Sequence, residues 1–309
     1  MAPFHSPPRQ SRQRVPRLAL ALAVLLAVPF GMARGRPDKV DVLRIGTSGT
    51  LTAEKDNSKE KGALASLRDF IKEETGLKNE IESEKDWREL ADKMAKGQLH
   101  VGVFQGYEFA WAKEQHPDLQ VLALAINVSR YPVAYVVVRR DSAAKDFGGL
   151  EGQSLTLPDT GQRYLRLFVE RECQARGKEM NAFFSKVSFQ PNVEDCLDDV
   201  VDGVAQAAVL ERSSLEAYKR RKPGRFEKLK EVAKSQPFPP AVIACYDKVL
   251  DDATRKRFRD GLFGAGKKEK GRAMLDLFRL SGFEAPQDDF DKVVAATRKA
   301  YPPPKSEKK

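Results

Sequence analysis

Two sets of alternating strands and helices, separated by two long β-rich runs, constrain the fold of this chain more than any other feature. The first set begins with the strand at 40–45, and the second begins with the strand at 154–157. The β-rich runs at 119–126 and 131–139 lie between them. Strands that alternate with helices form parallel sheets covered on both faces. We therefore expect an α/β protein with two lobes, each a mainly parallel sheet flanked by helices, joined by two crossing strands.

The same pattern sets the expected boundaries of the lobes. The first lobe is discontinuous, because the chain returns to it through an apolar run near residue 241. We place the first lobe at residues 38–132 and 241–301, and the second lobe at 133–240. The remaining residues, 302–309, are rich in proline and lysine and are expected to form a disordered tail.

The N-terminus has the features of a secretory signal peptide. Arginines between residues 9 and 17 precede an apolar run at 18–30, and Gly31, Met32 and Ala33 follow it. That run is too short to span a membrane comfortably, which favours a signal peptide at residues 1–33 that is cleaved after Ala33. An uncleaved N-terminal anchor is the alternative.

The composition argues against several classes of function. The net charge is +10, but part of it lies in the leader and the tail, and the remaining acids and bases are interspersed. Such a mildly basic surface suits anionic solutes and does not resemble a nucleic-acid-binding face. No Cys/His nucleophile and no metal-ligand spacing is apparent, so we expect no catalytic residue, no metal and no cofactor.

The three cysteines leave one question open. Cys173 and Cys196 lie on the apolar faces of two predicted helices, and Cys245 lies in an apolar strand. In an oxidising compartment the first two could form a disulfide. The alternative is that both are small buried hydrophobic side chains. An enzyme built on this fold would need one of these thiols as its nucleophile, and the helix pattern buries them.

One turn is suited to bind an anion. The strand at 154–157 leads through Asp159, Thr160, Gly161 and Gln162 into a helix. The first N–H groups of a helix have no partner inside it, and the helix dipole favours negative charge there. Thr160 adds a hydroxyl, and Gly161 allows a solute to approach the backbone closely. Asp159 either brings a like charge toward an anion or caps the helix.

Several segments follow one another in an order known from one family. These segments are 43–47, 97–107, 135–142 with 150–152, and 250–258 with 282–283. In this order the chain resembles the phosphate/phosphite/phosphonate-binding family of periplasmic solute receptors, and the resemblance extends from about residue 40 to residue 301. In that family the turn of the second lobe is Ser-Thr-Ser-Gly-like, whereas this chain has Asp-Thr-Gly-Gln at 159–162.

The resemblance implies a fold, a function and a partner. The fold would be the type II periplasmic binding fold, with the solute between the lobes. The chain would be the periplasmic solute-binding component of an ABC importer for a small phosphate-, phosphite- or phosphonate-like oxyanion. It would act as a monomer, by lobe closure without chemistry, and deliver the solute to a permease at the inner membrane. A periplasmic ligand-sensing subunit of a membrane receptor with the same fold is the alternative.

Candidate ligand-binding residues come from both lobes. They are Thr47, Ser48, Gln105, Tyr107, Thr160, Gly161, Gln162, Arg163 and Glu211. Thr47 and Ser48 either donate to the solute or shape the turn that contains them. Tyr107 offers a ring and a hydroxyl, or packs beneath its loop. Arg163 pairs bidentately with an anionic group if it faces the cleft, and is otherwise solvated. Glu211 binds an ammonium or hydroxyl group, or forms a salt bridge at the rim.

Overall fold

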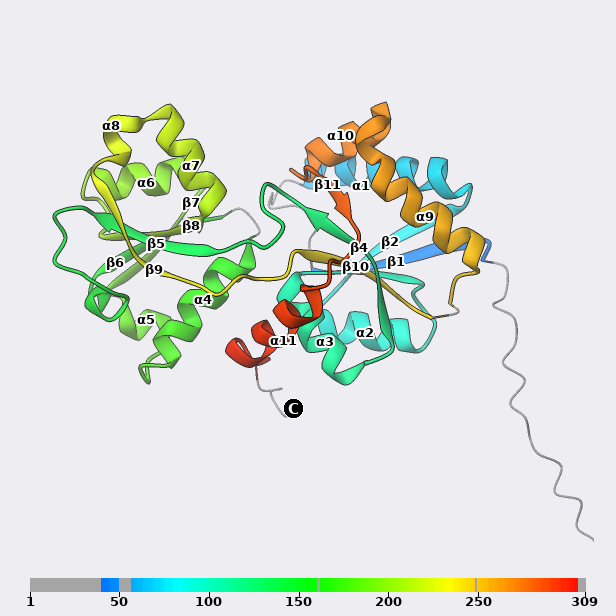
Figure 1. Cartoon of the computed structure of the whole chain (residues 1–309), viewed down its shortest axis with the longest axis horizontal. Helices are drawn as coiled ribbons and strands as arrows, with labels where there is room; N and C mark the ends of the chain where they lie inside the picture. The colour runs from blue at the N-terminus through cyan, green and yellow to red at the C-terminus, as the bar shows by residue number, and fades with distance from the viewer. Residues whose placement is uncertain (1–39, 50–56, 160–161, 248, 305–309) are drawn as a thin grey trace, which may run out of the picture. The chain divides into compact units, whose positions relative to one another are not determined.

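The described part of the chain forms two α/β lobes (Figure 1). The computed structural model describes residues 40–49, 57–159, 162–247 and 249–304. This is the two-lobed α/β architecture expected from the sequence. The signal peptide predicted at residues 1–33 lies outside the described residues.

The first lobe is built from two stretches of the chain. Its elements in the first stretch are β1 (Val42–Ser48), α1 (Asn57–Thr75), β2 (Lys78–Glu84), α2 (Trp87–Ala95), β3 (Val101–Phe104), α3 (Gly106–Gln115) and β4 (Leu119–Ile126). Its elements in the second stretch are β10 (Ala241–Tyr246), α9 (Asp252–Gly264), η2 (Ala265–Lys267), α10 (Glu269–Leu277), β11 (Gly282–Glu284) and α11 (Phe290–Ala300).

The second lobe is built from the chain between these stretches. Its elements are β5 (Ala134–Arg139), η1 (Gly148–Leu150), β6 (Ser154–Pro158), α4 (Arg163–Gln174), α5 (Met180–Phe183), β7 (Lys186–Gln190), α6 (Val193–Val201), β8 (Ala207–Glu211), α7 (Arg212–Arg221), α8 (Pro223–Phe226) and β9 (Leu229–Lys234). The exact lobe boundaries, 38–132 with 241–301 and 133–240, stay a prediction.

Both sheets are mixed, with most strands of each running in one direction. The first sheet has the order β11-β4-β10-β3-β1-β2, and β10 runs antiparallel to β3 and β4. The second has the order β7-β6-β8-β5-β9, and β5 runs antiparallel to β8 and β9. β5 and β10 are the strands that enter their sheets directly from the other lobe. β11, which follows α10, also runs antiparallel to its neighbour β4.

Two segments that lie outside the assigned strands connect the lobes, one between β4 and β5 and one between β9 and β10. They are residues 127–133 and 235–240. Phe238 N donates to Pro132 O at 2.9 Å, so the two segments run side by side. Prolines at 132, 237, 239 and 240 have no N–H to donate to a ladder, and this ends strand pairing in both segments.

Helices cover both faces of each sheet (Figure 1). In the first lobe, Leu43 and Ile45 of β1 pack on the side of α1, α9 and α10. Trp87 and Leu90 of α2 belong to a second hydrophobic cluster on the opposite face. This second cluster continues through Phe238 of the crossing segment into the second lobe. This hydrophobic cluster therefore extends from the first lobe, through the crossing segment, into the second lobe.

The three cysteines do not form a disulfide. Cys173, Cys196 and Cys245 are free and buried, as the hydrophobic alternative for the first two requires.

The first residues of the predicted C-terminal tail contact the folded chain. Disorder was expected from residue 302 onward, but the carbonyl of Pro302 accepts from Arg171 and that of Pro304 accepts from Arg88. Proline lacks a donor but keeps its carbonyl, and so these residues can be held by arginines. Residues 305–309 lie outside the described residues.

Gly106 provides a test of how α3 meets the hinge. A Cβ atom at Gly106 would lie 1.9 Å from Pro239 O, so Gly106→Ala must displace the crossing segment. We expect this variant to lose about 1–3 kcal/mol of unfolding free energy, measured by urea denaturation. Gly224→Ala is the matched control, because no atom lies within 4 Å of the added methyl group there. Equal stability of the two variants would contradict this packing.

Candidate ligand-binding site

The end of β1 presents two buried hydroxyls. Thr47 and Ser48 are 2 % and 6 % exposed. Thr47 Oγ1 donates to Gly49 O at 2.8 Å, so it shapes the turn, whereas Ser48 Oγ donates to the carboxylate of Glu108. β1 and β3 are parallel neighbours, so their C-terminal ends meet at one edge of the sheet. The two sequence-predicted hydroxyls thus have different partners.

The turn from β3 into α3 adds Gln105, Tyr107 and Glu108. Gln105 is the N-cap residue of α3, and its backbone N–H donates to Glu108 Oε2 at 3.3 Å. Tyr107 is buried and packs edge-on against Trp111, with ring centroids 4.9 Å apart. Burial raises the pKa of Tyr107, so its hydroxyl is a neutral hydrogen-bond donor. Tyr107 therefore packs beneath its loop, and its role in binding stays a prediction.

Glu108 is a residue of this site that the sequence analysis did not select. It is 6 % exposed, and burial raises the pKa of its carboxyl. The hydrogen bond from Ser48, the Gln105 N–H and the charge of Arg163 act in the opposite direction without reversing the shift. The sequence contained a signal for this contact, since an acid at the third position of a helix commonly accepts a hydrogen bond from the backbone N–H of the N-cap residue.

Glu211, at the end of β8, is the centre of a hydrogen-bond network in the second lobe. It is 2 % exposed. It accepts from Gln162 Nε2 at 2.6 Å, Tyr164 Oη at 2.8 Å and Ser213 Oγ at 2.8 Å. Burial, followed by the adjacent Glu211 charge, raises the pKa of Tyr164 and keeps its hydroxyl protonated. The carboxylate is buried and fully engaged rather than exposed in a salt bridge at the rim.

Tyr164 was also missed by the sequence analysis. It follows Arg163 directly, in the first turn of α4, and its ring packs 5.2 Å from that of Phe238 in the crossing segment. In the sequence, a tyrosine within an apolar helical stripe looks like a core residue. Its contact with Glu211 could not be predicted, because it depends on β6 and β8 being neighbours in the sheet. Tyr164 links the site to the hinge.

Arg163 reaches from the second lobe to the first. Its side chain begins at the first residue of α4, and its guanidinium lies beside Gly49 at the end of β1. A methyl group on Gly49 would lie 2.7 Å from Nη2 and 2.9 Å from Nη1. Gly49 has φ +77°, a conformation that glycine adopts without strain. Arg163 also lies near Tyr107 and Glu108, since its positive charge opposes the rise in pKa that burial causes in both side chains.

Two residues of the predicted anion-binding turn, Thr160 and Gly161, lie outside the described residues. Asp159 is exposed, and its backbone N–H donates to Gln190 O at 2.7 Å. The N-cap residue of α4 is Gln162, three positions after Asp159, and the capping interpretation of Asp159 stays a prediction.

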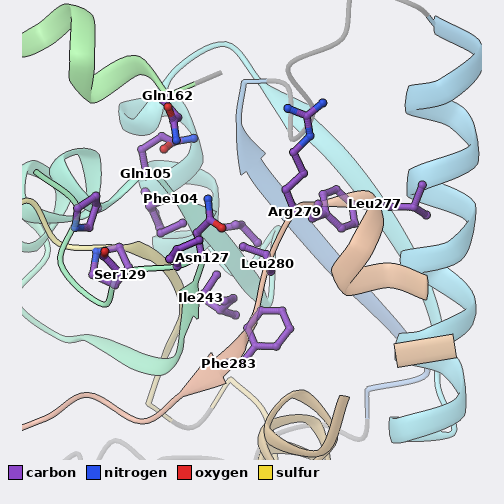
Figure 2. A pocket seen from close by; sticks show the side chains of 18 of the residues that line it. Phe104, Gln105, Asn127, Ser129, Gln162, Ile243, Leu277, Arg279, Leu280 and Phe283 are labelled. Carbon is purple, nitrogen blue, oxygen red and sulfur yellow. The ribbon is translucent and has the colours of Figure 1, made fainter. Parts of the chain in front are cut away.

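A cavity of about 950 Å³ joins the polar ends of the two lobes. Five sequence-predicted residues line it, namely Ser48, Gln105, Tyr107, Gln162 and Glu211. Figure 2 shows Gln105 and Gln162 close together at one end of it. Thr47 and Arg163 are not among the lining residues, although Arg163 lies against Gly49 beside it. A cavity with convergent polar groups between two lobes is the arrangement of a solute-binding protein.

The three cysteines, which an enzyme built on this fold would need as nucleophiles, are buried. Burial raises the pKa of Cys173 to about 12 and that of Cys196 and Cys245 to about 11, so these thiols are protonated at neutral pH. Among the residues that the structure describes, no group of three or more His, Cys, Asp or Glu side chains is arranged to hold a metal. No helix in the described ranges is long and apolar enough to cross a membrane.

Comparison with known proteins identifies the family. Residues 50–290 match the model of the family described as "ABC transporter, phosphonate, periplasmic substrate-binding protein". The chain therefore belongs to this family, as the sequence resemblance predicted. It is a periplasmic solute-binding component of the kind that works with an ABC permease. A search of curated proteins found no match.

Solved structures of similar fold agree with this assignment. XAC2383 from Xanthomonas citri is 17% identical, with a TM-score of 0.59 over 84% of this chain and 99% of that one. PhnD1 from Prochlorococcus marinus, in complex with methylphosphonate, is 15% identical, with a TM-score of 0.56 over 84% and 97%. A binding component of a phosphonate transporter from Pseudomonas aeruginosa is 14% identical, with a TM-score of 0.52 over 84% and 87%. They support the two-lobed fold.

The buried carboxyl of Glu108 predicts a pH effect on stability. Its pKa is raised in the folded protein, so the folded state binds more protons than the unfolded state above the ordinary value of 4.5. Its contribution to unfolding free energy is therefore complete at low pH and is lost as pH rises toward the folded pKa. We expect wild type to lose stability relative to Glu108→Gln as the pH rises above 4.5, measured by urea denaturation. Glu114→Gln, an exposed position on α3, is the control. A difference between wild type and Glu108→Gln that does not change with pH would contradict the burial argument.

Proposed function

We propose that the solute is a small oxyanion of the phosphate, phosphite or phosphonate type. It would be held between the lobes by Thr47, Ser48, Gln105 and Tyr107 on one side. On the other side it would meet Thr160, Gly161, Gln162, Arg163 and Glu211. The lobes would close over it as a hinge, and no bond would be made or broken in the solute. The chain would act as a monomer, exported by a signal peptide at residues 1–33 and docking on a permease at the inner membrane.

The position of Arg163 is the observation that carries this proposal. Its guanidinium lies at the junction of the two lobes, with both terminal nitrogens toward Gly49. A guanidinium binds a tetrahedral oxyanion through two parallel hydrogen bonds. An arginine that starts on one lobe and ends at the other makes its best contacts only when the lobes are close. Such differential contact is what allows a solute to favour the closed state.

Two buried acids lie among the proposed contacts. Glu211 accepts from three donors, so an anion beside it would meet a like charge and would compete for those donors. Glu108 has a raised pKa and a buried carboxyl, and in its protonated form it is itself a donor. Ser48 and Gln162 now donate to these acids, and the solute would compete for the same hydrogens.

The ligands in structures of similar fold are also anions. PhnD1 holds methylphosphonate, and XAC2383 has been solved with chloride and with ATP. These ligands belong to those proteins, and their shared property is negative charge. Methylphosphonate is therefore a suitable first probe for this chain.

Isothermal titration calorimetry with methylphosphonate, phosphite, phosphate and sulfate tests the proposal, with glycerol as the neutral solute. We expect at least one of the oxyanions to bind and Arg163→Gln to weaken its binding by about 10- to 100-fold, because a hydrogen bond to a charged group contributes about 1.5–3 kcal/mol. Arg166→Gln is the matched control, since Arg166 is an exposed residue of the same helix that pairs with Glu170 at 2.7 Å.

Two results would contradict the proposal. One is the absence of binding by every oxyanion while the protein is folded. The other is equal affinity of wild type and Arg163→Gln for the anion that binds. Arg166→Gln should match wild type in each case.

A further inference from the structure

Each half of the site has a buried aromatic residue behind it. In the first lobe, Tyr107 packs edge-on against Trp111, with ring centroids 4.9 Å apart. In the second lobe, Tyr164 donates to Glu211 at 2.8 Å, and its ring centroid lies 5.2 Å from that of Phe238. Tyr107, Tyr164 and Glu211 line the cavity, whereas Trp111 and Phe238 are not among its lining residues. Trp111 and Phe238 therefore support the site from outside it.

Tyr301 joins these two supports. It is the C-cap residue of α11, which packs against α3 (Figure 1). Its carbonyl accepts from Trp111 Nε1 at 2.6 Å, and its ring centroid lies 4.6 Å from that of Phe238. A series of contacts therefore runs from one half of the site to the other. Its members, in order, are Tyr107, Trp111, Tyr301, Phe238, Tyr164 and Glu211.

Every member of this series is buried. Their exposed fractions lie between 1 % for Phe238 and 7 % for Tyr107 and Tyr164. Protein interiors are close-packed, so a buried side chain cannot shift unless its neighbours shift with it. A displacement of the Tyr301 ring must therefore be followed by Phe238, and a displacement of its carbonyl by Trp111.

Further contacts tie Tyr301 and its neighbour to the hinge and to α4. Burial raises the pKa of Tyr301 to about 12, so its hydroxyl stays protonated, and this hydroxyl lies beside Ser235 of the crossing segment. The next residue, Pro302, accepts through its carbonyl from Arg171 of α4. The same helix supplies the tyrosine of the second-lobe half of the site. The C-terminal residues thus meet α4 both directly and through the crossing segment.

We infer that Tyr301 is a positioning residue for the solute site, which holds the two halves of the site in register without touching the solute. This rests on the proposed oxyanion site and adds to it a residue from outside the cavity. One buried residue contacts the support of each half, Trp111 through its carbonyl and Phe238 through its ring. A solute held by two lobes gains its contacts only when both halves are correctly placed, and a preformed placement raises affinity.

Calorimetry with methylphosphonate on three single variants tests the inference. Tyr301→Leu removes the ring and keeps the carbonyl, and we expect affinity to fall by about fivefold, which corresponds to the loss of one aromatic pair. Tyr301→Phe keeps the ring and should stay within about twofold of wild type. Phe290→Leu is the matched control, because Phe290 is a buried ring of α11 that lies 6.2 Å from Phe109 in the same lobe. It loses similar packing and should leave affinity unchanged.

Arg171→Gln keeps the test valid if Tyr301→Leu does not fold. Arg171 is half-buried, and its replacement removes the hydrogen bond to the Pro302 carbonyl without opening a cavity in the core. We expect affinity for methylphosphonate to fall by about threefold, in the range of one hydrogen bond. Arg166→Gln on the same helix is its control, and equal affinity of Arg171→Gln and wild type would then overturn the inference.

The outcomes separate this inference from the proposed function. Equal affinity of wild type and Tyr301→Leu, while methylphosphonate binds, overturns the positioning role and leaves the oxyanion function standing. A loss in Phe290→Leu or Tyr301→Phe as large as that in Tyr301→Leu also overturns it. If no oxyanion binds wild type, the proposed function fails, and small-angle scattering of the unliganded variants decides on Tyr301. A profile of Tyr301→Leu equal to wild type then overturns the inference, and one that changes while that of Phe290→Leu does not supports it.

Discussion

The contact between the two crossing segments is the constraint on which the rest of the structure depends. Residues 127–133 and 235–240 run together, tied by the hydrogen bond from Phe238 N to Pro132 O. The ring of Phe238 contacts Tyr164 on one side and Tyr301 on the other, with centroids 5.2 and 4.6 Å apart. These contacts place α4 and the C-terminal residues on one hinge, and they bring Arg163 to the end of β1.

The C-terminal residues act as a third connection between the lobes. The Tyr301 carbonyl accepts from Trp111 Nε1 in the first lobe at 2.6 Å, and the Pro302 carbonyl accepts from Arg171 in the second. Both are single hydrogen bonds to backbone, which a small rotation can break or re-form. The hinge therefore combines a rigid apolar core with polar contacts of modest strength at its edge. This combination is compatible with closure over a small solute.

Much of the fold was predictable from local patterns, because alternating strands and helices leave a clear periodicity. The direction of β5 and β10 was not predictable, since it depends on which lobe each strand is reached from. At the site, Ser48, Gln105, Tyr107, Gln162 and Glu211 were predicted from their positions after strands, and they line one cavity. Their pairings were not predictable, because Ser48 with Glu108 and Gln162 with Glu211 join residues 60 and 49 positions apart.

The burial of the two acids was also beyond sequence analysis. A Glu after a strand looks the same in sequence whether it is exposed or, like Glu211, 2 % exposed and bound by three donors.

Small-angle X-ray scattering of the exported chain, with and without saturating methylphosphonate, tests the central claim most directly, namely that the solute is held between two lobes that close on it. The account predicts that the radius of gyration falls when calorimetry shows that the site is saturated. An identical scattering profile with and without bound solute would contradict the account.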